Sequence, residues 1–311
     1  MKAEHKKYYG VIPPIITPID EHENVDEDGF RGLLDYCIAH GLHGIFVAGS
    51  NGETMALTQE QRNRAIKIAV DQCADRVPVM SGVMDTSTRR VIDNIKALEQ
   101  AGGTCAVITS IFYARHTSQS ETIRHFEEIA RHTDIDLMIY NIPMFTGMTL
   151  TPDTIEEIAK IPSVKGYKDS SGQFSAFQKL LPKFVNLDFS MLQGATVYAM
   201  SSMLLGADGF VPSIAPLFPE LFVESYEVSR QGNIPLAIRY DELLRETSKI
   251  LAMSKSATAA NKFALSTLGF TSPWIIQPQD TCTKEDEQKI LRQIDVVNEK
   301  YEMLKQSIGK K

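Results

Sequence analysis

Short apolar runs alternate with longer amphipathic segments along most of the chain. The runs are rich in Val, Ile and Phe and predict eight strands. They lie near residues 10–16, 44–47, 77–81, 105–109, 137–141, 164–168, 189–193 and 209–211. Most are apolar without a polar residue at every second position, which is typical of parallel strands that are covered on both faces.

The segments between these runs have the periodicity and the caps of helices. Thr58 with Gln61, and Ser118 with Glu121, have the spacing of a capping box, in which each side chain satisfies an unpaired backbone donor. One apolar stripe at helical spacing consists of Phe30, Leu33, Leu34, Cys37 and Ile38. Each such stripe needs a sheet to cover it.

Eight strand and helix units in succession favour a closed barrel. They take up about 230 residues, which is the length of a (β/α)8 TIM barrel, whereas a doubly wound sheet usually has fewer strands. We therefore predict a catalytic barrel over residues 1–233. Three helical patterns follow, at 235–253, 257–268 and 284–306, and predict a helical annex over 234–311 that packs on the barrel and supports oligomer contacts.

Composition and charge argue against several classes of protein. The 32 Lys and Arg residues against 39 Asp and Glu residues give a net charge of -7. The chain therefore has no excess of positive charge to attract nucleic acid, which we do not expect as a partner. No apolar stretch approaches the roughly 18 residues of a membrane span, and the first ten residues lack the apolar core of a signal peptide, so we expect a cytoplasmic protein. Four widely spaced cysteines without a CxxC pair give no support to a zinc ribbon or a disulfide framework.

Barrel enzymes place their sites at the carboxyl ends of the strands, so polar residues that close a strand are the candidates for chemistry. Several predicted strands end in such residues. They are the segment 49–53, Thr109, Tyr140, Asn141, Lys168 and Asp169. All would face one mouth of the barrel.

Lys168 is the foremost candidate because it ends an apolar strand. Burial would lower the pKa of its ammonium group and leave a neutral amine that can attack a carbonyl to form a Schiff base. Tyr140, at the end of the preceding strand, could move protons between the lysine and the substrate. From spacing alone, a surface lysine and a core tyrosine with one hydrogen bond remain open alternatives.

The segment Gly49 to Glu53 places small polar residues between glycines. Its backbone N–H groups could hold a carboxylate or a phosphate, and a plain turn between a strand and a helix is the alternative. His116, His125 and His132 have no carboxylate set at ligand spacing, so we expect no metal site.

Three motifs in this order, GSNGE at 49–53, YNIPMFTG at 140–147 and GYKD at 166–169, resemble the dihydrodipicolinate synthase and N-acetylneuraminate lyase family. The resemblance covers nearly the whole chain. It implies a Schiff-base-forming lyase or synthase on a (β/α)8 barrel that needs no cofactor and forms a homo-oligomer, a dimer or a tetramer.

The resemblance also implies roles for individual residues. Lys168 matches the Schiff-base lysine, and Tyr140 matches the proton-shuttling tyrosine. Ser50 and Asn51 match the pair that holds the carboxylate of pyruvate or another 2-keto acid. Other positions that the resemblance assigns to the substrate pocket are Tyr113, Phe145, Gly194 and Val211. Thr109, which closes the fourth predicted strand, is expected to line the same pocket. In related proteins a tyrosine near the position of Tyr113 can reach a neighbouring subunit's site.

Departures from the family pattern bear on the substrate. Phe145 stands where dihydrodipicolinate synthases have an arginine for the second substrate's carboxylate, and a phenyl ring cannot form that ion pair. Thr196 and Val197 replace the Asp-Glu pair of sialic acid lyases. The GSNGE form and the segment 168–172 are more similar to the 2-keto-3-deoxy sugar acid and 4-hydroxy-2-oxoglutarate aldolase branches.

We therefore expect an aldolase that interconverts a 2-keto acid of the 2-keto-3-deoxy sugar acid type with pyruvate plus an aldehyde. One alternative is a 4-hydroxy-tetrahydrodipicolinate synthase that uses pyruvate and aspartate semialdehyde. Another is a non-catalytic barrel that binds 2-keto acids.

Overall fold

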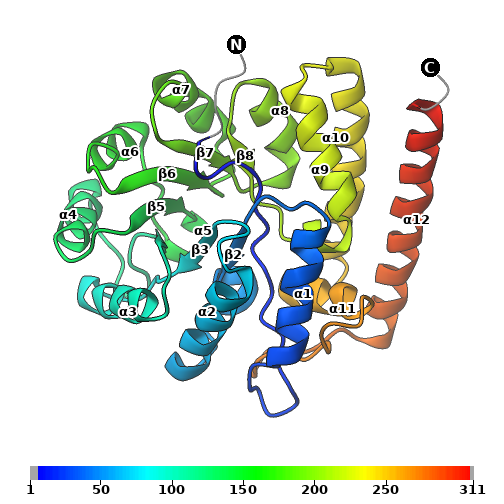
Figure 1. The fold of residues 1–311 in the computed structure, drawn as a ribbon, viewed down its shortest axis with the longest axis horizontal. Coiled ribbons are helices and arrows are strands. Elements are labelled where there is room, and N and C mark those ends of the chain that lie inside the picture. The colour runs from blue at the N-terminus through cyan, green and yellow to red at the C-terminus, as the bar shows by residue number, and fades with distance from the viewer. Residues whose placement is uncertain (1–5, 309–311) are drawn as a thin grey trace.

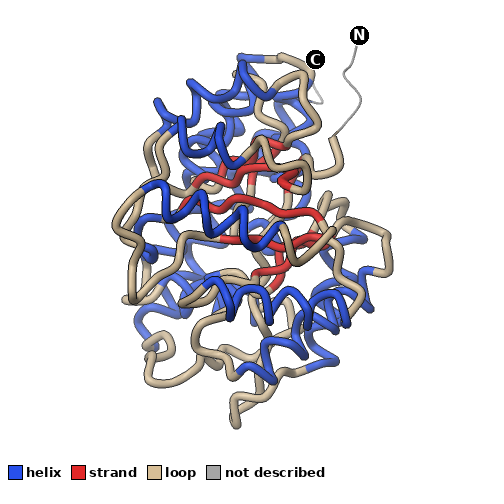
Figure 2. The backbone as a smooth tube through the Cα atoms, turned by 90° about the vertical axis from the view of Figure 1, so that its left-hand side faces the viewer, coloured by secondary structure: helices blue, strands red, loops and turns tan. Residues whose placement is uncertain are grey.

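Eight parallel strands form a curled sheet at the centre of the computed structural model, which describes residues 6–308, and helices surround it (Figures 1 and 2). The strands run in the order β1-β8-β7-β6-β5-β4-β3-β2. They are β1 (Gly10–Val11), β2 (Ile45–Val47), β3 (Val79–Gly82), β4 (Cys105–Ile108), β5 (Asp136–Asn141), β6 (Val164–Asp169), β7 (Ser190–Gln193) and β8 (Gly209–Phe210). The predicted (β/α)8 barrel is confirmed.

The segment after β1 joins the first strand to the second and so closes the sheet. Pro14 forms a parallel bridge with Phe46, the Ile15 N–H donates to the Phe46 carbonyl at 2.9 Å, and the Phe46 N–H donates to the Pro13 carbonyl at 3.0 Å. Two consecutive prolines lack N–H donors. The predicted strand at 10–16 is therefore shorter, with regular pairing only at Gly10 and Val11.

Helices cover the outside of the sheet. They are α1 (Glu27–Ala39), α2 (Gln59–Cys73), α3 (Thr88–Gln100), α4 (Gln119–Ala130), α6 (Pro152–Ile158), α7 (Phe174–Phe184), α8 (Ala199–Leu204) and α9 (Pro219–Arg230). The single-turn helix α5 (Pro143–Thr146) instead follows the carboxyl end of β5 directly. The Thr58 side chain accepts a hydrogen bond from the Gln61 N–H, and Ser118 and Glu121 form the expected capping box. These local signals fix where α2 and α4 begin.

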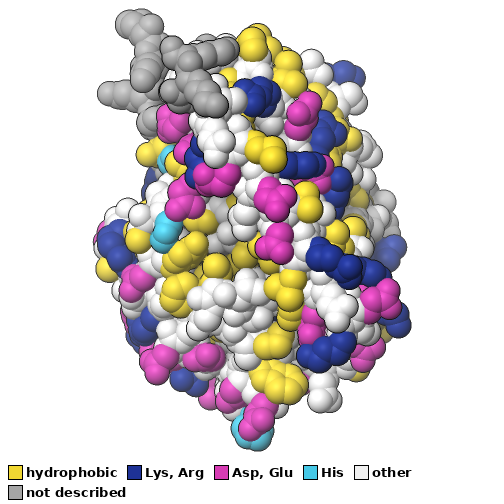
Figure 3. Space-filling view, turned by 90° about the vertical axis from the view of Figure 1, so that its right-hand side faces the viewer, with side chains coloured by type: hydrophobic (Ala, Val, Ile, Leu, Met, Phe, Trp, Pro, Cys, Tyr) yellow, Lys and Arg dark blue, Asp and Glu magenta, His cyan; other side chains and the backbone are white. Residues whose placement is uncertain are grey.

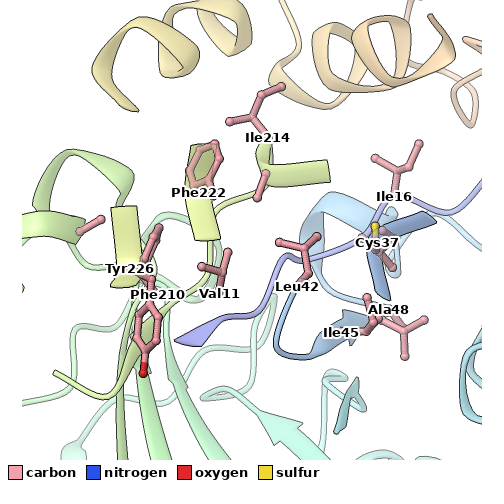
Figure 4. Close-up of a cluster of buried hydrophobic side chains, with 14 of the residues drawn as sticks. Val11, Ile16, Cys37, Leu42, Ile45, Ala48, Phe210, Ile214, Phe222 and Tyr226 are labelled. Atoms are coloured by element: carbon pink, nitrogen blue, oxygen red, sulfur yellow. The ribbon is translucent and has the colours of Figure 1, made fainter. Parts of the chain in front are cut away.

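Two apolar layers hold the barrel together. The outer layer lies between the sheet and the helices, and Figure 4 shows part of it, with Phe222 and Tyr226 of α9 close to Val11 and Phe210. The inner layer fills the barrel with side chains that include Phe46, Tyr140, Leu192 and Val211. Because parallel strands of a barrel alternate inward and outward residues, both layers come from the same apolar runs.

Three further helices follow β8 and α9. They are α10 (Ile234–Ser248), α11 (Ala257–Ser266) and α12 (Lys284–Ile308), and their positions agree with the three predicted helical patterns. The long helix α12 lies along the outside of α10 (Figure 1). The face that it forms mixes acidic and basic side chains with scattered apolar ones (Figure 3). The division of the chain at residues 233 and 234 into two units stays a prediction.

Two expectations from the sequence concern the state of the cysteines and the crossing of a membrane. Cys37, Cys73 and Cys105 are buried, Cys282 is partly exposed, and all four are free thiols. Among residues 6–308, no helix combines the length and the apolar character needed to cross a bilayer.

Candidate active site

Lys168 and Tyr140 lie side by side inside the barrel. The two residues are register partners on β6 and β5, so their side chains project to the same face. Lys168 is only 3% exposed, and its Nζ atom lies 3.9 Å from the centre of the Tyr140 ring and 4.5 Å from that of Phe46. The lysine is therefore buried between two aromatic faces and does not extend along the surface.

This burial changes the protonation of the lysine. Desolvation lowers the pKa of Lys168 from 10.5 to about 7, and no neighbouring carboxylate offsets it. A substantial share of the side chain is therefore the neutral amine near neutral pH. Such an amine is the species that attacks a carbonyl carbon.

The Tyr140 hydroxyl lies between two serines. Burial raises the pKa of this phenol, while hydrogen bonds to the side chains of Ser50 and Ser170 act in the opposite direction. The phenol therefore keeps its proton at neutral pH and has two hydroxyl partners. An arrangement of this kind can pass a proton to or from a group bound beside Lys168.

The turn after β2 brings backbone donors to the same region. Ser50 to Gly52 form one turn of 3-10 helix, and the N–H groups of Ser50 and Asn51 have no acceptor inside that turn. The Asn51 side chain is engaged elsewhere, since its Nδ2 donates to the Pro14 carbonyl at 2.6 Å and its Oδ1 accepts from Asn261 at 3.1 Å. The turn offers an anion backbone donors and the Ser50 hydroxyl.

Gly194, directly after β7, lies against the lysine. A Cβ atom at this position would lie 3.2 Å from the Lys168 Cε atom, 2.1 Å from the Ser170 Oγ atom and 2.7 Å from the Asp169 carbonyl oxygen. Val211 and Thr109, which follow β8 and β4, are both buried, and Val211 belongs to the inner apolar layer with Tyr140. The structure thus brings Gly194 and Val211 into the surroundings of the lysine.

Two expected pocket residues are placed differently. The Tyr113 side chain is 94% exposed on a residue with φ of 67°, and the Phe145 ring, on α5, is 56% exposed. Neither belongs to the buried group around Lys168. Tyr113 lies in the long connection between β4 and α4, where the motif spacing could not fix its position.

Asp169 supports the site from the far side of β6. Its Oδ1 accepts hydrogen bonds from the Tyr167 hydroxyl at 2.8 Å and the Asn141 amide at 3.1 Å, and Ser171 donates to its Oδ2 at 3.1 Å. Burial raises the pKa of this carboxyl group, and these donors act against that rise. The network fixes the ends of β5 and β6, which carry the tyrosine and the lysine.

Sequence reasoning missed Phe46 and Ser170 as members of the site. The inward position of Phe46 in an apolar strand marked it only as core. Ser170 follows Lys168 by two residues, and no signal in the segment 168–172 assigned it a role of its own. Among the described residues, no group of three or more His, Cys, Asp or Glu side chains could hold a metal ion.

The chain is similar to known proteins of one family, both in sequence and in structure. The model of the dihydrodipicolinate synthetase family matches residues 7–296. The 4-hydroxy-tetrahydrodipicolinate synthase of Neisseria meningitidis is 31% identical over 281 residues, which are 90% of this chain and 96% of that protein.

Solved structures agree with the sequence matches. Dihydrodipicolinate synthase from Bacteroides thetaiotaomicron superposes with a TM-score of 0.89 at 30% identity, covering 94% of this chain and 99% of that one. YagE of E. coli K12, a prophage protein of the dihydrodipicolinic acid synthase family in complex with pyruvate, has a TM-score of 0.89 at 25% identity with the same coverage.

Proposed function

Because the chain belongs to the dihydrodipicolinate synthetase family and is a lyase of that family, we propose that it forms a Schiff base between Lys168 and pyruvate. The single observation that carries this proposal is the buried lysine whose pKa is lowered to about 7 beside the Tyr140 ring. The pyruvate bound to YagE supports the choice of keto acid.

The proposed reaction starts with attack of the neutral Lys168 amine on C2 of pyruvate. The carbonyl oxygen leaves as water and a protonated imine remains. Loss of a proton from C3 gives an enamine, whose carbon attacks the carbonyl carbon of an aldehyde and forms a new carbon–carbon bond. Cleavage is the reverse of these steps, and hydrolysis of the imine frees the product and the lysine.

Tyr140 is proposed to move the protons in these steps. Its hydroxyl, beside Ser50 and Ser170, would give a proton to the departing carbonyl oxygen, and the resulting phenolate would take the proton that leaves C3. The hydroxyl would then give that proton to the aldehyde oxygen, and in cleavage the phenolate would take one from a C4 hydroxyl. The N–H groups of Ser50 and Asn51 would hold the substrate carboxylate and so orient C2 toward the lysine.

Aspartate semialdehyde is the aldehyde that the relatives support best. The Neisseria protein is named a 4-hydroxy-tetrahydrodipicolinate synthase, and the Bacteroides structure is a dihydrodipicolinate synthase. These names favour the synthase over the cleavage of 2-keto-3-deoxy sugar acids, which the sequence motifs put first. The first candidate function is therefore condensation of pyruvate with aspartate semialdehyde.

A second candidate keeps the same chemistry with an uncharged aldehyde. It is favoured by Phe145, whose half-exposed ring cannot pair with a carboxylate, and by Thr196 and Val197 in the connection after β7. An aldolase that releases pyruvate from a 2-keto-3-deoxy acid fits these residues. Homo-oligomer formation, expected from the resemblance, stays a prediction.

Two assays on the purified protein separate the candidates. One measures consumption of pyruvate in the presence of aspartate semialdehyde, and the other measures pyruvate release from 2-keto-3-deoxy acids through a coupled dehydrogenase. Higher kcat/KM in the first assay supports the synthase, and higher kcat/KM in the second supports the aldolase. Turnover in neither, with the protein folded, would contradict both and favour a barrel that only binds keto acids.

A further inference from the structure

We infer that Asn261 and Lys262, two consecutive residues of helix α11, position the Gly49 to Glu53 turn for its grip on the substrate carboxylate. The C-terminal helices would then be part of the active site and more than an outer support for the barrel. This inference rests on the proposed function of the turn as a carboxylate-binding element.

Asn261 ties the turn to the other end of the sheet. It is fully buried, and its Nδ2 atom donates to the Asn51 Oδ1 atom at 3.1 Å and to the Ser213 carbonyl at 3.1 Å. Asn51 belongs to the connection after β2, and Ser213 to the connection after β8. One amide from the C-terminal region therefore joins two loops at the mouth of the barrel.

Lys262 holds the last residue of the turn through a buried ion pair. Its Nζ atom pairs with the Glu53 carboxylate, and the two side chains are 0% and 2% exposed. The other Glu53 oxygen accepts a hydrogen bond at 2.8 Å from the N–H group of Ile276, a residue that follows α11. Removing one partner of a buried pair leaves an uncompensated charge, so the two groups strongly constrain each other's position.

The turn needs such support because its backbone is unfavourable in isolation. Glu53 has φ of 54° and lies in the left-handed region, which is strained for a residue with a side chain. The other anchors of the turn are bonds to the segment after β1, from the Thr17 hydroxyl to the Gly52 carbonyl and from Asn51 to the Pro14 carbonyl. The Asn261 and Lys262 contacts fix its remaining sides.

A positioning role predicts a selective effect on substrates that carry a carboxylate. Loss of the Asn261 amide would let the N–H groups of Ser50 and Asn51 move out of position, while Lys168 on β6 would stay in place. Binding of pyruvate would weaken, and binding of a neutral ketone of similar size would not. General damage to the barrel would weaken both.

The test measures imine formation on Lys168 in the full-length protein, trapped with borohydride and followed by intact mass. Pyruvate and methyl pyruvate are compared in the wild type, Asn261→Ala, the double variant Lys262→Met with Glu53→Gln, and Lys255→Met. Lys255 precedes α11 and is exposed, so Lys255→Met is the matched control. Melting temperatures show that each variant is folded.

We expect the half-saturating pyruvate concentration to rise about tenfold in Asn261→Ala, the loss of roughly one or two hydrogen bonds, with the methyl pyruvate value within about twofold. The double variant should follow Asn261→Ala, and Lys255→Met should match the wild type. Equal weakening for both ketones, or no weakening, would overturn the inference. If Asn261→Ala does not fold, Asn261→Ser is judged by the same ratio.

A failure of the proposed function looks different. In that case the wild-type protein itself gives no pyruvate adduct on Lys168. An inference that fails while the proposed function stands gives a wild-type adduct whose dependence on pyruvate is the same in every folded variant.

Discussion

Tyr140 and Lys168 are register partners on adjacent parallel strands, and the lysine Nζ atom lies 3.9 Å from the centre of the tyrosine ring. The aromatic face excludes water from the amine without offering it a counter-charge. One contact therefore accounts for two properties of the site, the lowered pKa of Lys168 and the presence of a hydroxyl close to the expected position of the substrate.

The rate of imine formation should depend on pH in a way that reports the buried lysine. With a pKa of about 7, the fraction of Lys168 in the neutral amine form rises about tenfold per pH unit below pH 7 and levels off above it. The initial rate of borohydride-trapped pyruvate adduct should follow this curve between pH 5 and 9. A rate that keeps rising to pH 10 would show an ordinary solvated lysine.

The same shift predicts how Lys168→Met changes stability. The folded-state pKa of about 7 lies below the ordinary value of 10.5, so between these values the unfolded chain binds more protons than the folded one. The free energy of unfolding of the wild type therefore rises with pH over this range. Below pH 7 the lysine destabilises the fold most, and the methionine variant should gain most there.

Urea unfolding of both proteins at pH 6.5 and pH 9.5 checks this sign. The stability advantage of Lys168→Met should be larger at pH 6.5 by roughly 1 to 4 kcal/mol. An advantage that is constant across pH would contradict the lowered pKa.

Tyr140→Phe should separate proton transfer from the covalent step. The ring that covers Lys168 is kept and only the hydroxyl is lost, so a pyruvate adduct should still form, at a lower rate. Turnover should fall about 100-fold to 10,000-fold, the usual contribution of a positioned acid or base. Tyr36→Phe on the outer helix α1 is the control and should retain wild-type kcat. Full turnover in Tyr140→Phe would assign the proton transfer to another group.

Gly194→Ala tests how tightly the site is packed. The added methyl group would meet the Ser170 Oγ atom and the Asp169 carbonyl, and only the serine side chain can rotate away. We expect a loss of about 1 to 3 kcal/mol in the free energy of unfolding and a lower rate of adduct formation. The double variant Gly194→Ala with Ser170→Ala should recover part of the stability. Wild-type stability in Gly194→Ala would mean that the site is more open than the structure shows.

Phe145→Arg addresses the second substrate. A guanidinium at this position can hold a carboxylate with two hydrogen bonds, so kcat/KM for aspartate semialdehyde should rise about tenfold. The adjacent Met144 is 83% exposed, and Met144→Arg adds the same charge as a control. An equal gain in both variants would reflect charge attraction alone, and no gain would place the aldehyde elsewhere.

The fold was predictable because each strand is a short apolar run and most helix starts carry a local cap. The N-cap at Thr58, the capping box at Ser118 and the three C-terminal helices are placed as expected. The box expected at Thr58 is incomplete, because the Gln61 side-chain oxygen accepts from the Val25 N–H instead. The first strand was overestimated because the segment at Pro13 and Pro14 meets β2 through one isolated bridge, with hydrogen bonds between Phe46 and the residues on either side of Pro14, and forms no regular ladder. Apolar periodicity does not register the missing N–H donors of proline.

The site was predictable only where chemistry lies at the end of a strand. Lys168 and Tyr140 have that position, and their motifs are local. Asn261 and Asn51 are 210 residues apart in the sequence, so no local motif or spacing could predict their contact. Phe46 carries no polar group, and its role depends on which residue lies opposite across the barrel. Such relationships arise only when the strands close into a ring.

The most direct measurement of the central proposal is peptide mass spectrometry after incubation of the protein with pyruvate and borohydride. We predict one stable adduct per chain on Lys168, lost in Lys168→Met and retained in Lys255→Met. A folded protein that gives no adduct, or an adduct on a different lysine, would contradict the assignment of Lys168 as the Schiff-base residue.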